Sequence, residues 1–161
     1  MRRYIIKVFI IFNIYILTYF PSFAETFIYS GGCFWCTEAD MEKIPGVIEV
    51  TSGFTSGTTE NPKYIPGQWG DHREAALVEY DPKIISFEDL IVHVFKTIDY
   101  EDGEGQFCDR GRSYSPAIYY KNKEEKKIIL SLAPKSSIVP IEKETKFYPV
   151  RLEHQDYYKK N

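Results

Sequence analysis

The hydrophobic and polar positions of the chain follow two different periods, and the clearest period is helical. Between residues 86 and 98 the apolar side chains recur every three or four positions, which places them on one face of an α-helix. They are Phe87, Leu90, Ile91, Val94, Phe95 and Ile98. Ser86 stands just before this run and Asp89 follows three residues later, a pattern typical of an N-cap. We therefore predict a helix that begins after Ser86 and packs this face against a core.

Shorter stretches rich in β-branched and aromatic residues predict strands at 25–30, 47–51, 74–80, 115–120 and 138–142. Further helices are expected over 33–44 and over 123–132, the second behind an Asn122 cap, with one or two helical turns at 153–159. Strands that alternate with helices in a chain of this length predict an α+β fold. We expect a two-layer α/β sandwich, in which helices pack on a ferredoxin-like mixed sheet.

Two polar segments, 52–71 and 99–113, are longer than most connections in a compact domain. Loops of this length usually have a function of their own or are mobile. We therefore expect functional residues in both.

Residues 1–24 differ in composition from the rest of the chain. Three basic residues in the first seven positions precede an apolar run over 8–20, and the segment ends in Ser22-Phe23-Ala24. This is the layout of a secretory signal peptide that is cut after Ala24, which leaves one domain over 25–161. The alternative is an uncleaved anchor, although the run is shorter than the roughly 20 residues that span a bilayer. Both interpretations predict an exported, periplasmic or otherwise extracytoplasmic protein.

The charge balance of the expected domain is acidic. The first 24 residues carry three of the 20 Lys and Arg and none of the 23 Asp and Glu, so the domain has a net charge of about −6. Nucleic acids bind basic surfaces, and we therefore do not expect them as partners. We expect a monomer without a metal or cofactor.

The sequence "GGCFWCTE" at 31–38 places Cys33 at the expected start of a helix and Cys36 one turn later. The unpaired N–H groups of a first helical turn stabilise a thiolate, so we expect the pKa of Cys33 to fall from about 8.5 to about 7. Cys33 would then be a nucleophile, the alternative being an inert core cysteine. Three residues along a helix separate Cα atoms by about 5 Å, a distance that a disulfide can bridge.

Five blocks of the chain resemble the A-type peptide methionine sulfoxide reductases. "GGCFWCTE" resembles their Gly-Cys-Phe-Trp signature, and "VIEVTSGFTSG" with "NPKY" resembles the strand and loop that follow. The remaining blocks are "DHREAALVEYDP", "CDRGRSYSPAIYY" and "FYPVRLEHQDYYKKN". The resemblance implies the reduction of methionine S-sulfoxide, free or in oxidised proteins, a reaction known for this enzyme class.

The resemblance also implies roles for single residues. Cys33 matches the nucleophile and Glu74 the acid that protonates the sulfoxide oxygen, which requires a raised pKa. Tyr64 and Tyr114 match two hydroxyl donors to the same oxygen, and Asp109 matches an aspartate that organises water or the surroundings of Cys33.

Phe34 and Trp35 match the apolar wall that receives the methyl group of the substrate. Beside them, Cys36 replaces the glycine that is usual after this Phe-Trp pair. Many members of the family resolve the sulfenic acid with cysteines of a C-terminal tail, whereas here Cys36 and Cys108 are the candidates. A thioredoxin-like dithiol would reduce the resulting disulfide.

Two other functions remain open on the residues alone. C-x-x-C in an exported protein is also typical of thioredoxin-like thiol-disulfide oxidoreductases, although Phe34-Trp35 is an unusual interior for such a motif. A metal-binding domain could combine the cysteines with His72, His93 or His154, but a single C-x-x-C is weak support for it.

Overall fold

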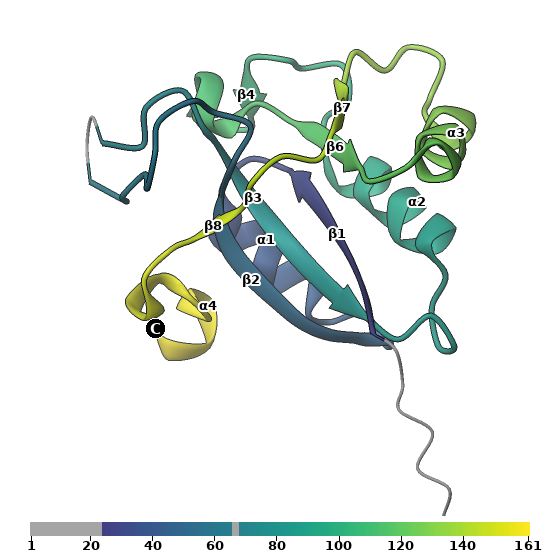
Figure 1. The fold of residues 1–161 in the computed structure, drawn as a ribbon, viewed down its shortest axis with the longest axis horizontal. Helices are drawn as coiled ribbons and strands as arrows, with labels where there is room; N and C mark the ends of the chain where they lie inside the picture. The colour runs from purple at the N-terminus through teal and green to yellow at the C-terminus, as the bar shows by residue number, and fades with distance from the viewer. Residues whose placement is uncertain (1–23, 66–67) are drawn as a thin grey trace, which may run out of the picture.

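The computed structural model describes residues 24–65 and 68–161, in which six strands form one sheet and two form a hairpin. The sheet order is β7-β6-β1-β3-β2-β8 (Figure 1). These strands are β1 (Glu25–Ser30), β2 (Val47–Thr55), β3 (Arg73–Tyr80), β6 (Ala117–Tyr120), β7 (Ile141–Lys143) and β8 (Tyr148–Pro149). β4 (Gly105–Gln106) and β5 (Asp109–Arg110) form the hairpin.

The central four strands confirm the predicted ferredoxin-like arrangement. β3 pairs antiparallel with both β1 and β2, and so it lies between two strands that a helix connects. β6 pairs antiparallel with the other edge of β1, and β7 adds a parallel strand beyond it, which makes the sheet mixed. This is the split βαβ topology with one extra strand at each edge.

The helices α1 (Phe34–Met41), α2 (Phe87–Thr97) and α3 (Lys123–Leu132) all contribute to one core with the sheet. The contribution of α1 to this core is Met41, whereas Phe34 belongs to a separate cluster. The predicted face of α2 is confirmed, and the Ser86 hydroxyl accepts the N–H of Asp89 at 3.1 Å. Asn122 caps α3 in the same way through the N–H of Glu125, at 2.9 Å.

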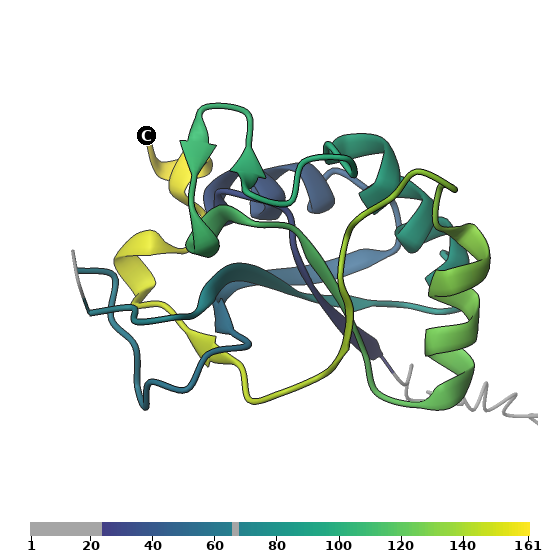
Figure 2. The ribbon, with the colours of Figure 1, turned by 90° about the horizontal axis from the view of Figure 1, so that it is seen from above.

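The opposite face of the sheet is covered by chain without helices. The segment between β7 and β8 crosses it, so that α1 and this segment lie on opposite sides of the sheet (Figures 1 and 2). Phe147 of this segment packs against a small cluster formed by Ile28, Ala75, Ala117 and Tyr119.

Several boundaries differ from those predicted. β2 continues four residues further, to Thr55, α1 already ends at Met41, and β7 begins at Ile141. The strands β4, β5 and β8 were not expected, nor were the 3₁₀ helices η1 (Arg112–Tyr114) and η2 (Leu152–His154). The terminal helical turns are η2 and α4 (Tyr157–Lys160).

The predicted leader lies outside the described residues except for Ala24. Within the described residues, no helix is long and apolar enough to cross a membrane.

Candidate active site

Cys33 is the N-cap residue of α1, as the sequence predicted. Its carbonyl oxygen accepts hydrogen bonds from the N–H groups of Cys36 and Thr37, both at 3.1 Å. The helix therefore begins at the residue that carries the thiol. Gly32 before it has φ +92°, and a Cβ there would lie 2.7 Å from that of Gln106. The second glycine of the motif is therefore required by the turn that places Cys33 at the helix start.

Glu74 lies on β3 beneath the first turn of α1. Its Oε2 accepts the N–H of Phe34 at 3.0 Å, and only 3% of the residue is exposed. Burial raises the pKa of Glu74 to about 7, with a further contribution from the charge of Asp109, although the Phe34 N–H acts to lower it. This agrees with the raised pKa expected for the acid, because an ionised carboxylate is costly where water is excluded.

Tyr64 comes from the first long loop and Tyr114 from η1, and both lie near Cys33 and Glu74. Burial raises the pKa of Tyr64 to about 12, and the charges of Glu74, Tyr114, Cys33 and Asp109 raise it further. Burial also raises the pKa of Tyr114, followed by the charges of Glu74, Asp109 and Cys33. The five residues that the resemblance selected are therefore close enough to perturb one another, and both phenols remain protonated donors at neutral pH.

The prediction of a lowered pKa for Cys33 is wrong for this state of the protein. Burial raises the pKa of the Cys33 thiol to about 12, and Cys36 and Glu74 raise it further. The N–H groups of Cys36 and Trp35 act to lower it, as expected at a helix start, but they do not offset the loss of water. The sequence indicated the helix terminus, whereas the burial depends on the surrounding fold.

Aromatic rings form a cluster beside the thiol. Phe34 lies 5.3 Å from Tyr64 and 5.7 Å from Phe54 between ring centroids, and Trp69 stacks on Tyr64 at 5.7 Å. Trp35 lies 5.5 Å from Tyr64 on the same side. Phe34 and Trp35 thus belong to one aromatic cluster, and their role as the wall for the substrate methyl group stays a prediction.

The C-terminal segment completes this wall, which the sequence did not reveal. Tyr157 stacks on Trp35 with ring centroids 3.9 Å apart and planes 11° from parallel. The side chain of Gln155 holds the segment to β2, with bonds of 2.8 Å and 2.9 Å to the backbone N–H and carbonyl of Ser52. The only signal for Tyr157 was that the last block as a whole resembles the family.

The three cysteines, all within the described residues, are free thiols in different surroundings. Cys36 is exposed, and its Sγ lies 3.5 Å from the hydroxyl of Tyr158. Cys33 and Cys36 both line a cavity of about 320 Å³ that also contains Asp109 and the exposed ring of Phe107. Cys108 is exposed in the turn between β4 and β5 and does not line this cavity.

The histidines of the metal-site hypothesis have partners other than the cysteines. His93 is bonded to Asp40 at 2.6 Å, and His72 to the carbonyl of Thr59 at 2.7 Å. His154 lies against the ring of Tyr64. Among the residues that the structure describes, no group of three or more His, Cys, Asp or Glu is arranged to hold a metal ion.

Comparisons with known proteins identify a family and a fold. The family model described as "Peptide methionine sulfoxide reductase" matches residues 25–161. "Peptide methionine sulfoxide reductase MsrA 2" of Rhizobium meliloti is 40% identical over 141 residues, which cover 83% of this chain and 71% of the relative. "Peptide methionine sulfoxide reductase MsrA/MsrB" of Vibrio cholerae is 42% identical over 82% of this chain, which spans 38% of that longer relative.

Solved structures show the same fold. "Methionine sulfoxide reductase A" of Corynebacterium diphtheriae has a TM-score of 0.77 at 29% identity, over 88% of this chain and 76% of that one. Reduced Mxr1 from Saccharomyces cerevisiae has a TM-score of 0.75 at 27% identity, over 89% and 88%. Another structure contains Mxr1 in complex with Trx2.

Proposed function

The chain belongs to the peptide methionine sulfoxide reductase family, an oxidoreductase family, and on that premise we propose that it reduces the S-sulfoxide of methionine at Cys33. Both the free amino acid and methionine sulfoxide in oxidised proteins are substrates in this proposal. The observation that carries it is the carboxyl group of Glu74, held under the N–H of Phe34 beside the thiol of Cys33.

In the first step, the sulfur of Cys33 attacks the sulfoxide sulfur while the sulfoxide oxygen takes up the proton that Cys33 gives up, which forms an S–S bond. The protonated oxygen is then transferred to the sulfur of Cys33 as the S–S bond and the original S–O bond break, so that the products are methionine and a sulfenic acid on Cys33. Glu74 transfers this proton: with a pKa of about 7 it can both donate a proton to the oxygen and accept one from the thiol at neutral pH.

Tyr64 and Tyr114 donate hydrogen bonds to the same oxygen as charge develops on it. Their raised pKa values keep both hydroxyl groups protonated, so both can donate throughout the neutral range. Asp109 acts on Glu74, because its charge raises the pKa of that carboxyl group.

Phe34 and Trp35 receive the methyl group on the substrate sulfur. Phe34 is fully buried, and the Tyr157 stack supports Trp35 from the side, so the wall is rigid. A wall of flat rings on one side and the oxygen donors on the other would accept one configuration at sulfur, for which we propose the S form.

Cys36 resolves the sulfenic acid in this proposal. Its thiol attacks the sulfur of Cys33, the hydroxyl group leaves as water with the Cys36 proton, and a disulfide forms. Support comes from the position of Cys36 on the same helical turn and from its effect on the pKa of Cys33. Cys108 remains the competing resolver.

A thioredoxin-like dithiol protein is the proposed reductant, in line with the complex of Mxr1 with Trx2. Residues 1–24 have the layout of an export signal, and we therefore place the reaction outside the cytoplasm, with the domain released as a monomer or tethered by its leader. The reductant would then receive its electrons across the membrane.

A single-turnover experiment tests the proposed reaction. The reduced protein is mixed with one equivalent of methionine S-sulfoxide, methionine is quantified, and the oxidised cysteines are located by mass spectrometry. We expect one methionine per chain and a bridge between Cys33 and Cys36, with no methionine from Cys33→Ser. Methionine formation by the Cys33→Ser variant would refute the proposal, whereas reduction of insulin disulfides without any methionine formation would favour a thiol-disulfide oxidoreductase.

A further inference from the structure

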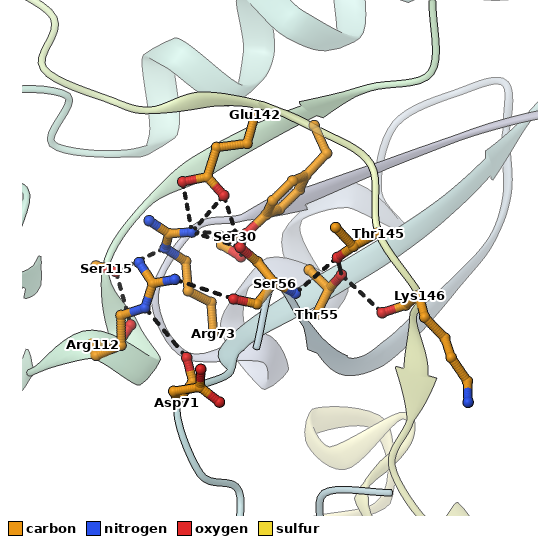
Figure 3. A network of polar contacts seen from close by, with 11 residues as sticks. Ser30, Thr55, Ser56, Asp71, Arg73, Arg112, Ser115, Glu142, Thr145 and Lys146 are labelled. Atoms are coloured by element: carbon orange, nitrogen blue, oxygen red, sulfur yellow. Dashed lines mark hydrogen bonds and ion pairs between the residues drawn. The ribbon is translucent and has the colours of Figure 1, made fainter. Parts of the chain in front are cut away.

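A buried arginine stands next to Glu74 in the sequence but on the other face of the sheet. Arg73 is only 3% exposed, and its guanidinium is hydrogen-bonded to four other residues (Figure 3). Its Nη1 donates to Glu142 at 3.0 Å and 3.2 Å, to the Tyr119 hydroxyl at 3.3 Å and to the Ser56 hydroxyl at 3.2 Å. Its Nε donates to the Ser115 hydroxyl at 2.9 Å.

Ser115 connects this arginine to the helix that carries Tyr114. The hydroxyl of Ser115 donates to the carbonyl of Arg112 at 2.8 Å, and its N–H donates to the same carbonyl at 3.2 Å. These bonds close η1, whose last residue is Tyr114. One hydroxyl group therefore joins the guanidinium of Arg73 to the turn that holds the phenol.

The other end of η1 is fixed by the side chain of Arg112. Its Nη2 donates to the carbonyl of Ser56 at 3.2 Å and its Nε to the carbonyl of Asp71 at 3.3 Å, as Figure 3 shows. Because Ser56 and Asp71 stand near the two ends of the loop that carries Tyr64, the same network also holds the base of that loop. Tyr114 thus lies between Arg112, which is bonded to this loop, and Ser115, which is bonded to Arg73 of the sheet.

The backbone at Ser56 adopts an unfavourable conformation within this network of hydrogen bonds. Ser56 has φ +60°, a conformation that favours glycine. Its hydroxyl donates to Glu142 at 2.7 Å and accepts from Arg73. Although burial acts to raise it, the bonds from Ser56 and Arg73 hold the pKa of Glu142 below its ordinary value, so that the ion pair stays charged.

We infer that Arg73 is a positioning residue for Tyr114: through Ser115 it fixes η1 so that the phenol points at the sulfoxide oxygen. The inference rests on the proposed function, in which Tyr114 donates to that oxygen. Arg73 does not contribute to the pKa shift of Glu74, so its effect on the reaction is geometric.

Kinetic coupling to Tyr114 distinguishes this role from general stabilisation. We measure the single-turnover rate of methionine formation for Arg73→Lys and Ser115→Ala, alone and combined with Tyr114→Phe. Loss of one donor to a developing charge costs about 10-fold or more, so we expect Tyr114→Phe to be slower by about that factor. Arg73→Lys and Ser115→Ala should each slow the wild-type reaction about 3- to 10-fold, yet change the Tyr114→Phe rate less than about 2-fold.

Two control variants separate geometry from folding. Tyr119→Phe removes another partner of the same guanidinium and leaves Ser115 in place, so it should lower the melting temperature but keep the rate within about 2-fold of wild type. Ser115→Thr retains a hydroxyl group and should restore the rate that Ser115→Ala loses.

The outcomes are distinguishable. Arg73→Lys and Ser115→Ala could slow the Tyr114→Phe protein as much as they slow the wild type. This result would overturn the positioning role of Arg73 and leave the proposed function intact. A Tyr114→Phe protein as fast as wild type would overturn both the positioning role and the donor role of Tyr114 in the proposed function.

Discussion

The replacement of Glu74 by glutamine has an effect on stability that can be worked out from the structure. Glutamine has the same shape, and its amide oxygen can still accept the N–H of Phe34, which lies 3.0 Å from the carboxylate. Only the ionisation is lost. The change therefore isolates the free energy of holding a charge at this position.

Burial raises the pKa of Glu74 from 4.5 to about 7, which corresponds to about 3 kcal/mol between the two protonation states. A group with a raised folded-state pKa binds its proton more tightly in the folded protein, so its stabilising effect is complete below pH 4.5 and is lost as the pH rises through 7. Glu74→Gln should therefore exceed the stability of the parent by less than about 1 kcal/mol at pH 5 and by about 3 kcal/mol at pH 8.

Urea denaturation at pH 5 and pH 8 measures this difference. Both proteins should carry Cys33→Ser, because the thiol of Cys33 is influenced by Glu74 and would otherwise titrate with it. A stability difference between the two proteins that is the same at both pH values would refute a buried carboxyl group with a raised pKa.

Three further predictions concern the reaction itself. The single-turnover rate should fall as the pH rises through about 7, the pKa of Glu74. In Glu74→Gln the rate should be lower by a factor on the order of 100 to 10,000 and should no longer depend on pH in this range. A wild-type rate that is constant from pH 6 to pH 9 would contradict the acid role. Cys36→Ser should give one methionine and then stop with a thioredoxin-like dithiol protein as reductant, whereas Cys108→Ser should turn over repeatedly, and the reverse result would make Cys108 the resolver. Tyr157→Ala should raise the KM for methionine sulfoxide and lower the free energy of unfolding by about 1 kcal/mol, because Trp35 loses a ring stacked at 3.9 Å. An unchanged KM, measured by steady-state kinetics, would show that the stack does not shape the apolar wall of Phe34 and Trp35.

Local features of the sequence were sufficient for the elements that carry the site. The cap at Ser86 and the apolar face of α2 lie within one short segment, and both were predicted correctly. Cys33 at the start of α1 followed from the two glycines before it. These features depend on neighbouring residues, so pattern alone could identify them.

Features that depend on distant contacts were missed or wrong. The pKa of Cys33 depends on burial, which outweighs the helix start. The stack of Tyr157 on Trp35 joins residues 122 positions apart through a segment held at Ser52. β8 pairs with β2 over only two residues, too few to leave a pattern in the sequence.

The carbonyl of Cys33 accepts the N–H of Cys36, so the two sulfur atoms of the proposed cycle belong to a single turn of α1. With Cys36 as the proposed resolver, the disulfide would join residues whose Cα atoms lie about 5 Å apart, so the proposed cycle requires neither the exchange of a loop nor the unfolding of a helix. An enzyme with this cycle would keep nearly one backbone shape throughout it. It should therefore continue to work when it is attached to a solid support or cross-linked within a crystal, where proteins that must refold a segment at each turnover slow down.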